Sequence, residues 1–304
     1  MVDTSDEWIK TRTGVLERRI LKDNSKGSSF LAIKAVQDLV EKTDLDTSEV
    51  DLVILTTATP DMPVAITSVY VATKIGAKNA YAFDLTAACS GFIYSLSVAA
   101  AYVESGKYRK VLVIGTDKMS SIVDYKDRTT CILFGDGAGA VLLEPNTRGV
   151  GILDEILKTD GEGRDSLKIE AGGSILPASQ ETVLNRQHFI KQDGQTVFKH
   201  AVSNMGAVIS GLMERNNLTK DNLNWLVPHQ ANRRIIDALG TRIGLDSEKV
   251  MLNIYKYGNT TTATIPLLLN EYQKKIKKGE NLILCAFGAG FTWGAIYLKW
   301  AYNS

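Results

Sequence analysis

The chain has 304 residues, of which 23% are charged and 44% hydrophobic, and its formal net charge is +1. This length allows two compact domains or one large domain of two similar halves, and the composition is typical of a globular protein rather than a disordered one. The small net charge, the lack of a long apolar run and the acidic first residues exclude a general nucleic-acid binder, a membrane-spanning chain and a signal peptide. We therefore expect a cytoplasmic protein with no nucleic-acid or membrane partner.

Cysteine spacing gives a further limit on the chemistry. Cys89, Cys131 and Cys285 are far apart and form no Cys-x-x-Cys pair. This pattern argues against a zinc site and against a secreted disulfide framework. We expect no metal and no bound cofactor.

In chain order, the first half alternates helix and strand signals. A helix is predicted from Ser28 or Ser29, as its N-cap, to residue 42, because apolar residues recur at helical spacing. Later elements are a buried strand within 49–59, a strand that runs into an apolar helix within 83–96, and β-rich segments at 110–115 and 139–144. Residues 117–133 include a polar stretch that we interpret as an insertion near the mouth of a site.

The second half repeats the first, which is the most informative feature of the sequence. EVDLVILTTAT matches NLNWLVPHQAN and the Cys89 region matches YGNTTTATIPLLL, both at the same separation along the chain, while KVLVIG matches NLILCA at a slightly shorter one. Residues 149–195, rich in Gly, Ser and Pro, are predicted to connect and cover the halves 1–148 and 196–304. Two duplicated βαβ-type sheets sandwiched by helices place a site at their junction.

Cys89 is the candidate nucleophile. It lies between a predicted strand end and a long helix, where unpaired N–H groups and the helix dipole favour a thiolate and so lower a cysteine pKa. An isolated cysteine is more often a small core residue, so Cys89 alone is weak evidence.

His229 and Asn259 strengthen this interpretation because the repeat brings them to corresponding junctions. Pro228 restricts the backbone before His229, whereas His188 and His200 occur in ordinary surface contexts. Asn259 could be a simple turn residue, but with Cys89 and His229 it supplies a nucleophile and two hydrogen-bond donors for carbonyl chemistry.

Small residues in FGAGFTWGA, from Phe287 to Ala295, allow backbone N–H groups to approach a ligand and form an oxyanion hole, with Cys89 and Ala289 as the expected donors. FGDGAGA at 134–140 is the copy of this segment in the first half and is expected to serve packing. Neither segment has the strand-to-helix context of a dinucleotide-binding fingerprint.

With these residues in place, the sequence resembles β-ketoacyl-[acyl-carrier-protein] synthase III, the initiating condensing enzyme of bacterial type II fatty acid synthesis. The resemblance covers nearly the whole chain and rests on six segments in the family's order: TSDEWIKTRTG, AACSGF, FGDGAGA, WLVPHQAN, YGNT and FGAGFTWG. It implies an α/β fold, a thiolase-like duplicated αβαβα layered sandwich with two mixed five-stranded sheets, and a homodimer. The family has a strand before TSDEW, so we expect the first strand to be missing.

The resemblance also implies roles for individual residues and two substrates, acyl-CoA and malonyl-acyl carrier protein. The implied catalytic triad is Cys89, His229 and Asn259. The implied coenzyme A contacts are Trp8, Arg12, Thr13, Arg128, Phe198 and Asn232. The implied acyl-pocket residues are Met62, which would reach across the dimer, with Met119, Phe134, Leu167 and Ile190. The implied carrier-protein docking residues are Lys199, Arg234 and Arg242, which could equally be an ordinary solvated helix face.

Together these inferences predict acyl transfer from acyl-CoA, with acetyl-CoA as the first candidate, to Cys89, followed by decarboxylative condensation with malonyl-acyl carrier protein. Two alternatives remain open at this point. One is a related synthase of secondary metabolism that uses other thioesters, and the other is a cysteine-dependent thioester hydrolase. A binding scaffold without catalysis is disfavoured by the intact Cys, His and Asn.

Overall fold

Two four-stranded mixed sheets form the frame of the computed structural model, which describes residues 2–303. The first sheet has the order β2 (Tyr81–Leu85), β1 (Leu52–Thr56), β3 (Val111–Asp117) and β4 (Gly137–Leu143). The second has the order β5 (Gly151–Thr159), β10 (Thr292–Lys299), β9 (Asn281–Gly288) and β8 (Trp225–Pro228). The β1 strand runs parallel to β3 and β8 runs parallel to β9, whereas the last strand of each half, β4 or β10, pairs antiparallel.

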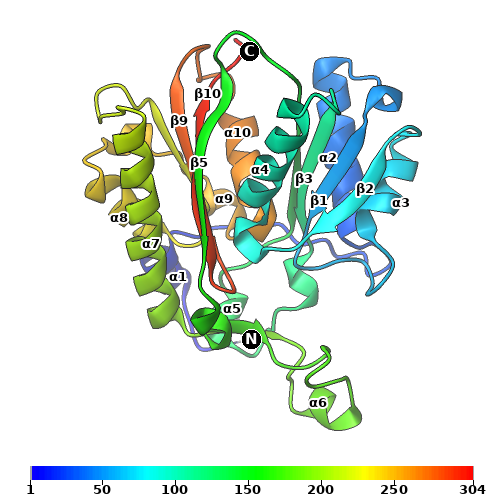
Figure 1. Cartoon of the computed structure of the whole chain (residues 1–304). Helices are drawn as coiled ribbons and strands as arrows, with labels where there is room; N and C mark the ends of the chain where they lie inside the picture. The colour runs from blue at the N-terminus through cyan, green and yellow to red at the C-terminus, as the bar shows by residue number, and fades with distance from the viewer. Residues whose placement is uncertain (1, 304) are drawn as a thin grey trace.

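Helices form three layers around and between these sheets (Figure 1). The larger helices are α2 (Ser28–Thr43), α3 (Thr67–Lys74), α4 (Gly91–Glu104), α7 (Gly194–Arg215), α8 (Arg233–Arg242) and α10 (Thr264–Tyr272). The α2 and α3 helices cover the outer face of the first sheet, α7 and α8 cover the second, and α4 and α10 lie between the sheets. The predicted αβαβα sandwich is therefore confirmed.

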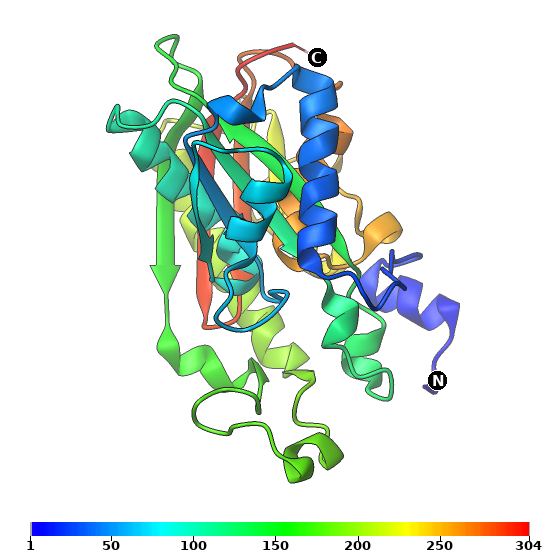
Figure 2. The ribbon, with the colours of Figure 1, turned by 90° about the vertical axis from the view of Figure 1, so that its right-hand side faces the viewer.

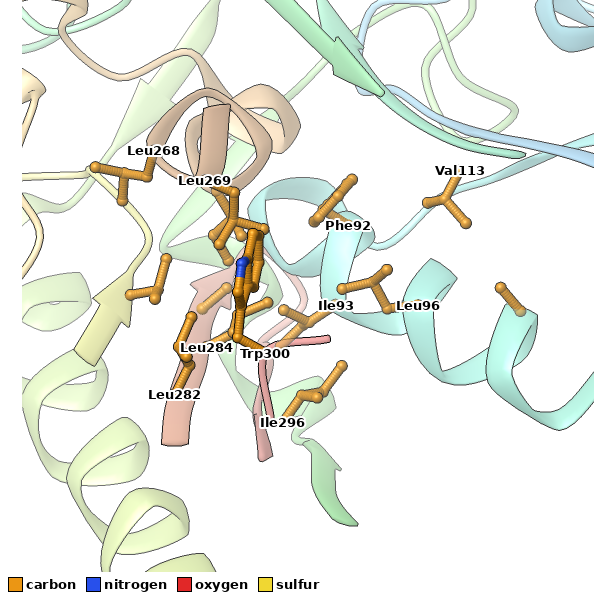
Figure 3. Close-up of a cluster of buried hydrophobic side chains, with 14 of the residues drawn as sticks. Phe92, Ile93, Leu96, Val113, Leu268, Leu269, Leu282, Leu284, Ile296 and Trp300 are labelled. Atoms are coloured by element: carbon orange, nitrogen blue, oxygen red, sulfur yellow. The ribbon is translucent and has the colours of Figure 1, made fainter. Parts of the chain in front are cut away.

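The central layer explains why α4 is apolar around most of its surface, since both of its sides face a sheet. Figure 3 shows α4 and α10 packed against β9 and β10 through one hydrophobic cluster. Its labelled members are Phe92, Ile93, Leu96, Val113, Leu268, Leu269, Leu282, Leu284, Ile296 and Trp300. Burial of each large apolar side chain contributes roughly 1.5–3 kcal/mol, so this cluster joins the two halves firmly.

Backbone geometry reproduces the internal repeat at the two junctions. A short 3-10 turn, Ala88–Ser90, precedes α4, and a matching turn, Thr261–Ala263, precedes α10. Ala88 and Thr261 occupy corresponding positions of the repeat, and both adopt positive φ angles, of 45° and 53°. Such angles are uncommon for residues with a Cβ, so the shared turn is a property of the duplicated fold rather than of one site.

The first sheet has four strands, as the expected absence of its first strand implies, whereas the second differs from the sequence prediction because it has four strands rather than five. In the second half, the counterpart of β2 is reduced to a single bridge between Leu226 and Val250. In the first sheet, no strand of residues 2–303 pairs with the outer edge of β4, where β5 lies in the second sheet. A groove of about 1470 Å³ lined by α2, α4, α10 and β4 follows this edge.

Three local features also differ from expectation. Gly27, not Ser28 or Ser29, is the N-cap of α2, because the distant Asp61 carboxylate accepts the Ser29 N–H at 3.0 Å. Residues 149–195 begin with β5, which belongs to the second sheet, before they become the covering segment. The region 117–133 is not only a surface excursion, because Met119, Val123 and Cys131 are buried in a cluster of their own.

Short elements surround the junction at one end of the sandwich. They are α1 (Asp6–Thr13), α5 (Arg128–Cys131), α6 (Gln180–Leu184), α9 (Ile254–Tyr257) and the hairpin of β6 (Leu167–Ile169) and β7 (Ile190–Gln192). Both ribbon views show α6 extending away from the sheets (Figures 1 and 2). The Arg186 guanidinium near α6 binds the Asp124 carboxylate, with Nε to Oδ2 at 2.7 Å, and so ties this segment to the insertion. No helix within residues 2–303 is long and apolar enough to cross a membrane.

Candidate active site

A cavity of about 480 Å³ lies where the two halves meet. Its wall is built by α1, the turn before α4, the region 117–133, the β6–β7 hairpin, α7, and the segments that follow β8 and β9. Cys89, His229 and Asn259 all line this one cavity, although they come from three separate regions of the chain. The sequence prediction that the repeat gathers these three side chains is consistent with this placement.

The 3-10 turn after β2 presents Cys89 to the cavity, and the residue is 8% exposed. Gly288, the last residue of β9, packs against this turn. A Cβ built on Gly288 would lie 2.8 Å from the Cys89 nitrogen and 2.9 Å from the Ser90 nitrogen, closer than real Cβ contacts. Only glycine therefore allows the end of β9 to approach Cys89 this closely.

The expected low pKa of Cys89 is not found in this structure. Burial, and to a smaller extent the nearby Asp117 carboxylate, raise the pKa of the Cys89 thiol to about 12. Desolvation of a thiolate outweighs the favourable field of the following helix. The resting protein consequently holds a protonated thiol, and attack on a substrate must be coupled to loss of its proton.

His229 follows β8 and is held from two sides. Its backbone N–H donates to the Cys285 carbonyl at 2.8 Å, and its Nδ1 lies 2.7 Å from the Thr264 hydroxyl. Its Nε2 is buried and has no hydrogen-bond partner in the described chain. Burial lowers the pKa of His229 to about 3, so the imidazole is neutral near pH 7.

The hydrogen bond at Nδ1 decides which imidazole nitrogen carries the proton. The Thr264 hydroxyl has a second acceptor, the Thr261 carbonyl, at the longer distance of 3.2 Å. Donation of this hydroxyl to Nδ1 would place the ring proton on Nε2, whereas its donation to the Thr261 carbonyl would leave Nδ1–H to donate to the hydroxyl oxygen. In the first arrangement His229 is a hydrogen-bond donor at its unpaired nitrogen.

Asn259 is oriented in the same way. Its backbone N–H donates to the Leu133 carbonyl at 2.9 Å, and its Oδ1 accepts the Thr261 N–H at 2.9 Å. Because the oxygen is engaged, the amide nitrogen is the part of the side chain that can donate to a ligand. The site therefore combines one thiol with a neutral imidazole, whose Nε2 is unpaired, and a carboxamide whose Nδ2 can donate.

Ala289 also lines the cavity, directly after β9. It is not among the described residues with a positive φ, so its Cβ causes no backbone strain there. The roles of Ala289 and Cys89 as oxyanion donors remain a prediction.

The six residues predicted to bind coenzyme A, Trp8, Arg12, Thr13, Arg128, Phe198 and Asn232, all line the same cavity. The guanidinium carbon of Arg128 lies 5.1 Å from the centre of the Trp8 ring, and that of Arg234 lies 5.3 Å from the centre of the Phe198 ring. Asn232 caps α8 through its side-chain oxygen, which accepts the Arg234 N–H at 2.9 Å. Aromatic rings and cations at one mouth suit a ligand with a base and phosphates.

The remaining predicted residues divide into two groups. Met119, Phe134, Leu167 and Ile190 line the cavity, whereas Met62 is 57% exposed in a loop before α3 and lies outside it. Arg234 borders the cavity mouth, while Lys199 on α7 and Arg242 on α8 are exposed elsewhere. His188 and His200, predicted to be ordinary, contact Thr182 and Phe291 respectively and do not line the cavity.

Three further residues shape the site although the sequence analysis did not select them: Asp117, Thr264 and Gly288. The repeat contains a signal that could have found them. Asp117 and Gly288 are the last residues of the matching strands β3 and β9. Thr264 is the counterpart of Gly91 in the repeat, and His229 is the counterpart of Thr56. Both pairs have the same separation along the chain.

Comparison with known proteins gives one consistent result. The family model described as 3-oxoacyl-[acyl-carrier-protein (ACP)] synthase III matches residues 83–161, and its C-terminal model matches residues 213–300. β-Ketoacyl-[acyl-carrier-protein] synthase III 2 of Bacteroides thetaiotaomicron is 52% identical over 303 residues, which cover 100% of this chain and 90% of that protein. The synthase III of Porphyromonas gingivalis strain W83 is 54% identical with the same coverage. The crystal structure of 3-oxoacyl-[acyl-carrier-protein] synthase III from Aquifex aeolicus has a TM-score of 0.89 and 40% identity, covering 98% of this chain and 92% of that one.

Proposed function

This chain belongs to the 3-oxoacyl-[acyl-carrier-protein] synthase III family, and we propose that its cavity transfers an acyl group from acyl-CoA to Cys89 and condenses it with malonyl-acyl carrier protein. The protein is thus a condensing acyltransferase of fatty acid synthesis. The observation that carries the assignment of residues is the single cavity that holds one thiol, one neutral imidazole and one carboxamide.

In the first half-reaction, the sulfur of Cys89 attacks the thioester carbonyl of acyl-CoA, with acetyl-CoA as the first candidate. The carbonyl oxygen becomes negative in the tetrahedral intermediate, and in this proposal the N–H groups of Cys89 and Ala289 donate to it. The bond between the carbonyl carbon and the CoA sulfur then breaks. The proton of the Cys89 thiol ends on the departing CoA.

In the second half-reaction, the malonyl thioester loses carbon dioxide and forms an enolate. Nε2–H of His229 and Nδ2–H of Asn259 donate to the enolate oxygen, and each preorganised donor of this type contributes about 10²–10³ in rate. The enolate carbon attacks the acyl group on Cys89, the carbon–sulfur bond breaks, and the released thiolate takes a proton from water. A neutral His229 suits this role, because it donates without transferring its proton to the enolate.

The outer cavity supports binding of the carrier portion of both substrates. Trp8 and Arg128 supply an aromatic face and a cation for the adenine end of CoA, while Phe198 and Asn232 border the route inward. Exposed Lys199, Arg234 and Arg242 lie on neighbouring helices and supply positive charge for an acidic carrier protein.

A homodimer is the second part of the proposal. The outer edge of β2 has no strand neighbour in residues 2–303, and α3 packs beside it. The adjoining loop and helix expose a group of apolar side chains, which are Met62, Val64, Ile66, Val69 and Tyr70. An open strand edge beside exposed apolar residues is suited to a symmetric contact with a second copy, which would bring Met62 to the partner's acyl pocket.

Substitution of Asn259 tests the proposed division of labour. Asn259→Ala is expected to abolish decarboxylation and condensation, because one enolate donor is lost, while acyl loading of Cys89 continues. Mass spectrometry of the acylated protein measures loading, and carbon dioxide release from malonyl-acyl carrier protein measures the second step. Asn79→Ala removes a carboxamide that binds only the distant Ser48 carbonyl and serves as the control.

The outcomes separate the alternatives. Loss of loading with intact decarboxylation would refute the assigned roles of these residues. Hydrolysis of acyl-CoA without condensation would favour a thioester hydrolase, and preference for malonyl-CoA over the carrier-bound form would favour a synthase of secondary metabolism.

A further inference from the structure

Asp117 is a buried carboxylate that joins the two halves beside the active site. It ends β3 and is 0% exposed. Its Oδ1 accepts hydrogen bonds from the Thr57 hydroxyl, the Ala58 N–H and the Thr59 hydroxyl at 3.1, 2.7 and 3.1 Å. Its Oδ2 accepts the N–H and the hydroxyl of Thr262 at 3.0 and 2.7 Å. One carboxylate therefore fixes a turn of its own half and a turn of the other half.

Thr262 is the counterpart of Cys89 in the internal repeat, and Asp117 is the counterpart of Gly288. The Thr262 N–H, which donates to the Asp117 carboxylate, thus corresponds to the Cys89 N–H of the first half. At Gly288 there is no side chain, and a Cβ there would come within 2.8 Å of the Cys89 nitrogen. The duplicated junctions have diverged, so one is closed by a carboxylate and the other is left open to a ligand.

The turn that Asp117 holds carries the supports of both proposed enolate donors. Thr261, directly before Thr262, donates its N–H to Oδ1 of Asn259 at 2.9 Å. Thr264, in the same turn just after Thr262, has its hydroxyl 2.7 Å from Nδ1 of His229. A shift of Thr262 would move both hydrogen bonds together, because they belong to one turn.

We propose that Asp117 is a positioning residue for the second half-reaction, because its carboxylate fixes the turn 261–264 and through it orients His229 and Asn259. This inference rests on the proposed function, since it assigns those two side chains to the malonyl step. Asp117 itself touches no reacting atom, because its oxygens are fully engaged by Thr57, Ala58, Thr59 and Thr262. Its effect is expected on kcat for decarboxylation rather than on substrate binding.

Asparagine cannot replace Asp117 in this role. All five partners donate to the carboxylate, whereas a carboxamide has one oxygen acceptor and one NH₂ donor. In Asp117→Asn, the NH₂ group must therefore face donors on one side. Either the Thr57–Thr59 turn or the Thr262 turn then loses its acceptor. A buried donor without an acceptor lowers the stability of the folded state.

The decisive experiment compares two hydroxyl donors to the same carboxylate. Thr262→Val and Thr57→Val each remove one such donor, but only Thr262 belongs to the turn that supports His229 and Asn259. We expect Thr262→Val and Asp117→Asn to lower kcat for malonyl decarboxylation about 10²-fold, with little change in KM. In Thr262→Val, which keeps the Asp117 charge beside Cys89, acyl loading is expected to be much less affected. Thr262→Ser restores the donor and is expected to restore kcat.

Two controls separate positioning from loss of stability. Asp51→Asn alters a carboxylate that accepts the Arg109 and Lys110 N–H groups at the other end of the first sheet, and it is expected to keep full activity. Thermal unfolding of every variant reports stability. A crystal structure of Thr262→Val reads the position of the side chains directly, and displaced His229 and Asn259 would support the proposal.

Equal losses of activity in Thr57→Val and Thr262→Val would overturn the proposal, as would a folded Thr262→Val with normal decarboxylation or with unmoved His229 and Asn259. If Asp117→Asn does not fold, the valine and serine variants of Thr262 still decide the matter. Absence of decarboxylation by the unchanged protein would instead reject the proposed function, and the crystallographic comparison would still test the positioning.

Discussion

Gly288→Ala introduces the smallest side chain at the closest approach of the second half to the nucleophile. The new Cβ would lie 2.8 Å from the Cys89 nitrogen and 2.9 Å from the Ser90 nitrogen, whereas ordinary contact begins near 3.4 Å. The neighbouring atoms are backbone, so they cannot move aside like a flexible side chain. The turn that carries Cys89 must shift by several tenths of an ångström or β9 must withdraw.

Overpacking of this kind costs about 1–3 kcal/mol of stability. A displacement of about 1 Å at a reacting group costs up to about 10²-fold in rate, so a loss of roughly tenfold to 10²-fold in acyl loading is expected. Rapid-quench mass spectrometry of Cys89 acylation measures this rate, and thermal unfolding measures stability. Gly173→Ala is the matched control, because a Cβ there meets no atom within 4 Å and the residue has no positive φ. Normal loading by folded Gly288→Ala would refute the idea that this contact positions the nucleophile.

Burial and hydrogen bonding at the site also determine how alkylation and stability depend on pH and how variants of Thr264 and Trp8 behave. In the free enzyme, alkylation of Cys89 by iodoacetamide should keep rising with pH beyond 9, since burial raises the thiol pKa to about 12, and a plateau below pH 9 would contradict that. The same shift predicts a loss of folding stability as pH rises from 9 towards 12, because the folded state retains a proton that the unfolded thiol releases. Thr264→Val should lower kcat for decarboxylation about tenfold by freeing the His229 ring, with recovery in Thr264→Ser, and equal activity of both variants would argue against tautomer control. Trp8→Ala should raise KM for acyl-CoA without changing alkylation of Cys89, and an unchanged KM would remove Trp8 from the CoA site.

The repeat made the layered fold and the meeting of Cys89, His229 and Asn259 predictable. Matching separations placed three strand ends at one junction, and the structure puts all three side chains on the wall of one cavity. Residues predicted from the family resemblance to bind CoA also reach this cavity, because α1, the region 117–133 and the starts of α7 and α8 border it.

Other properties depend on burial, which sequence spacing does not reveal. The helix start beside Cys89 suggested a lowered pKa, but the surrounding apolar packing and the Asp117 charge have the opposite and larger effect. The role of Asp117 was hidden because its hydrogen-bond partner Thr262 is distant in sequence and belongs to the other half. The strand count of the second sheet was wrong because one strand partner is reduced to a single bridge at Val250, whereas the expected absence of the first strand agrees with the lack of a partner for the outer edge of β4 in residues 2–303.

The strand β4 and its repeat counterpart β10 differ in solvent access, because within residues 2–303 only β10 has a neighbouring strand on its outer side. In the second sheet β5 saturates the amides of β10, whereas on β4 a row of peptide groups faces the groove without a strand partner in residues 2–303. Hydrogen exchange is therefore expected to be faster at these β4 amides than in the central strands β1 and β9. Because β4 and β10 are counterparts in the repeat, comparison of their amides measures how much protection one neighbouring strand provides.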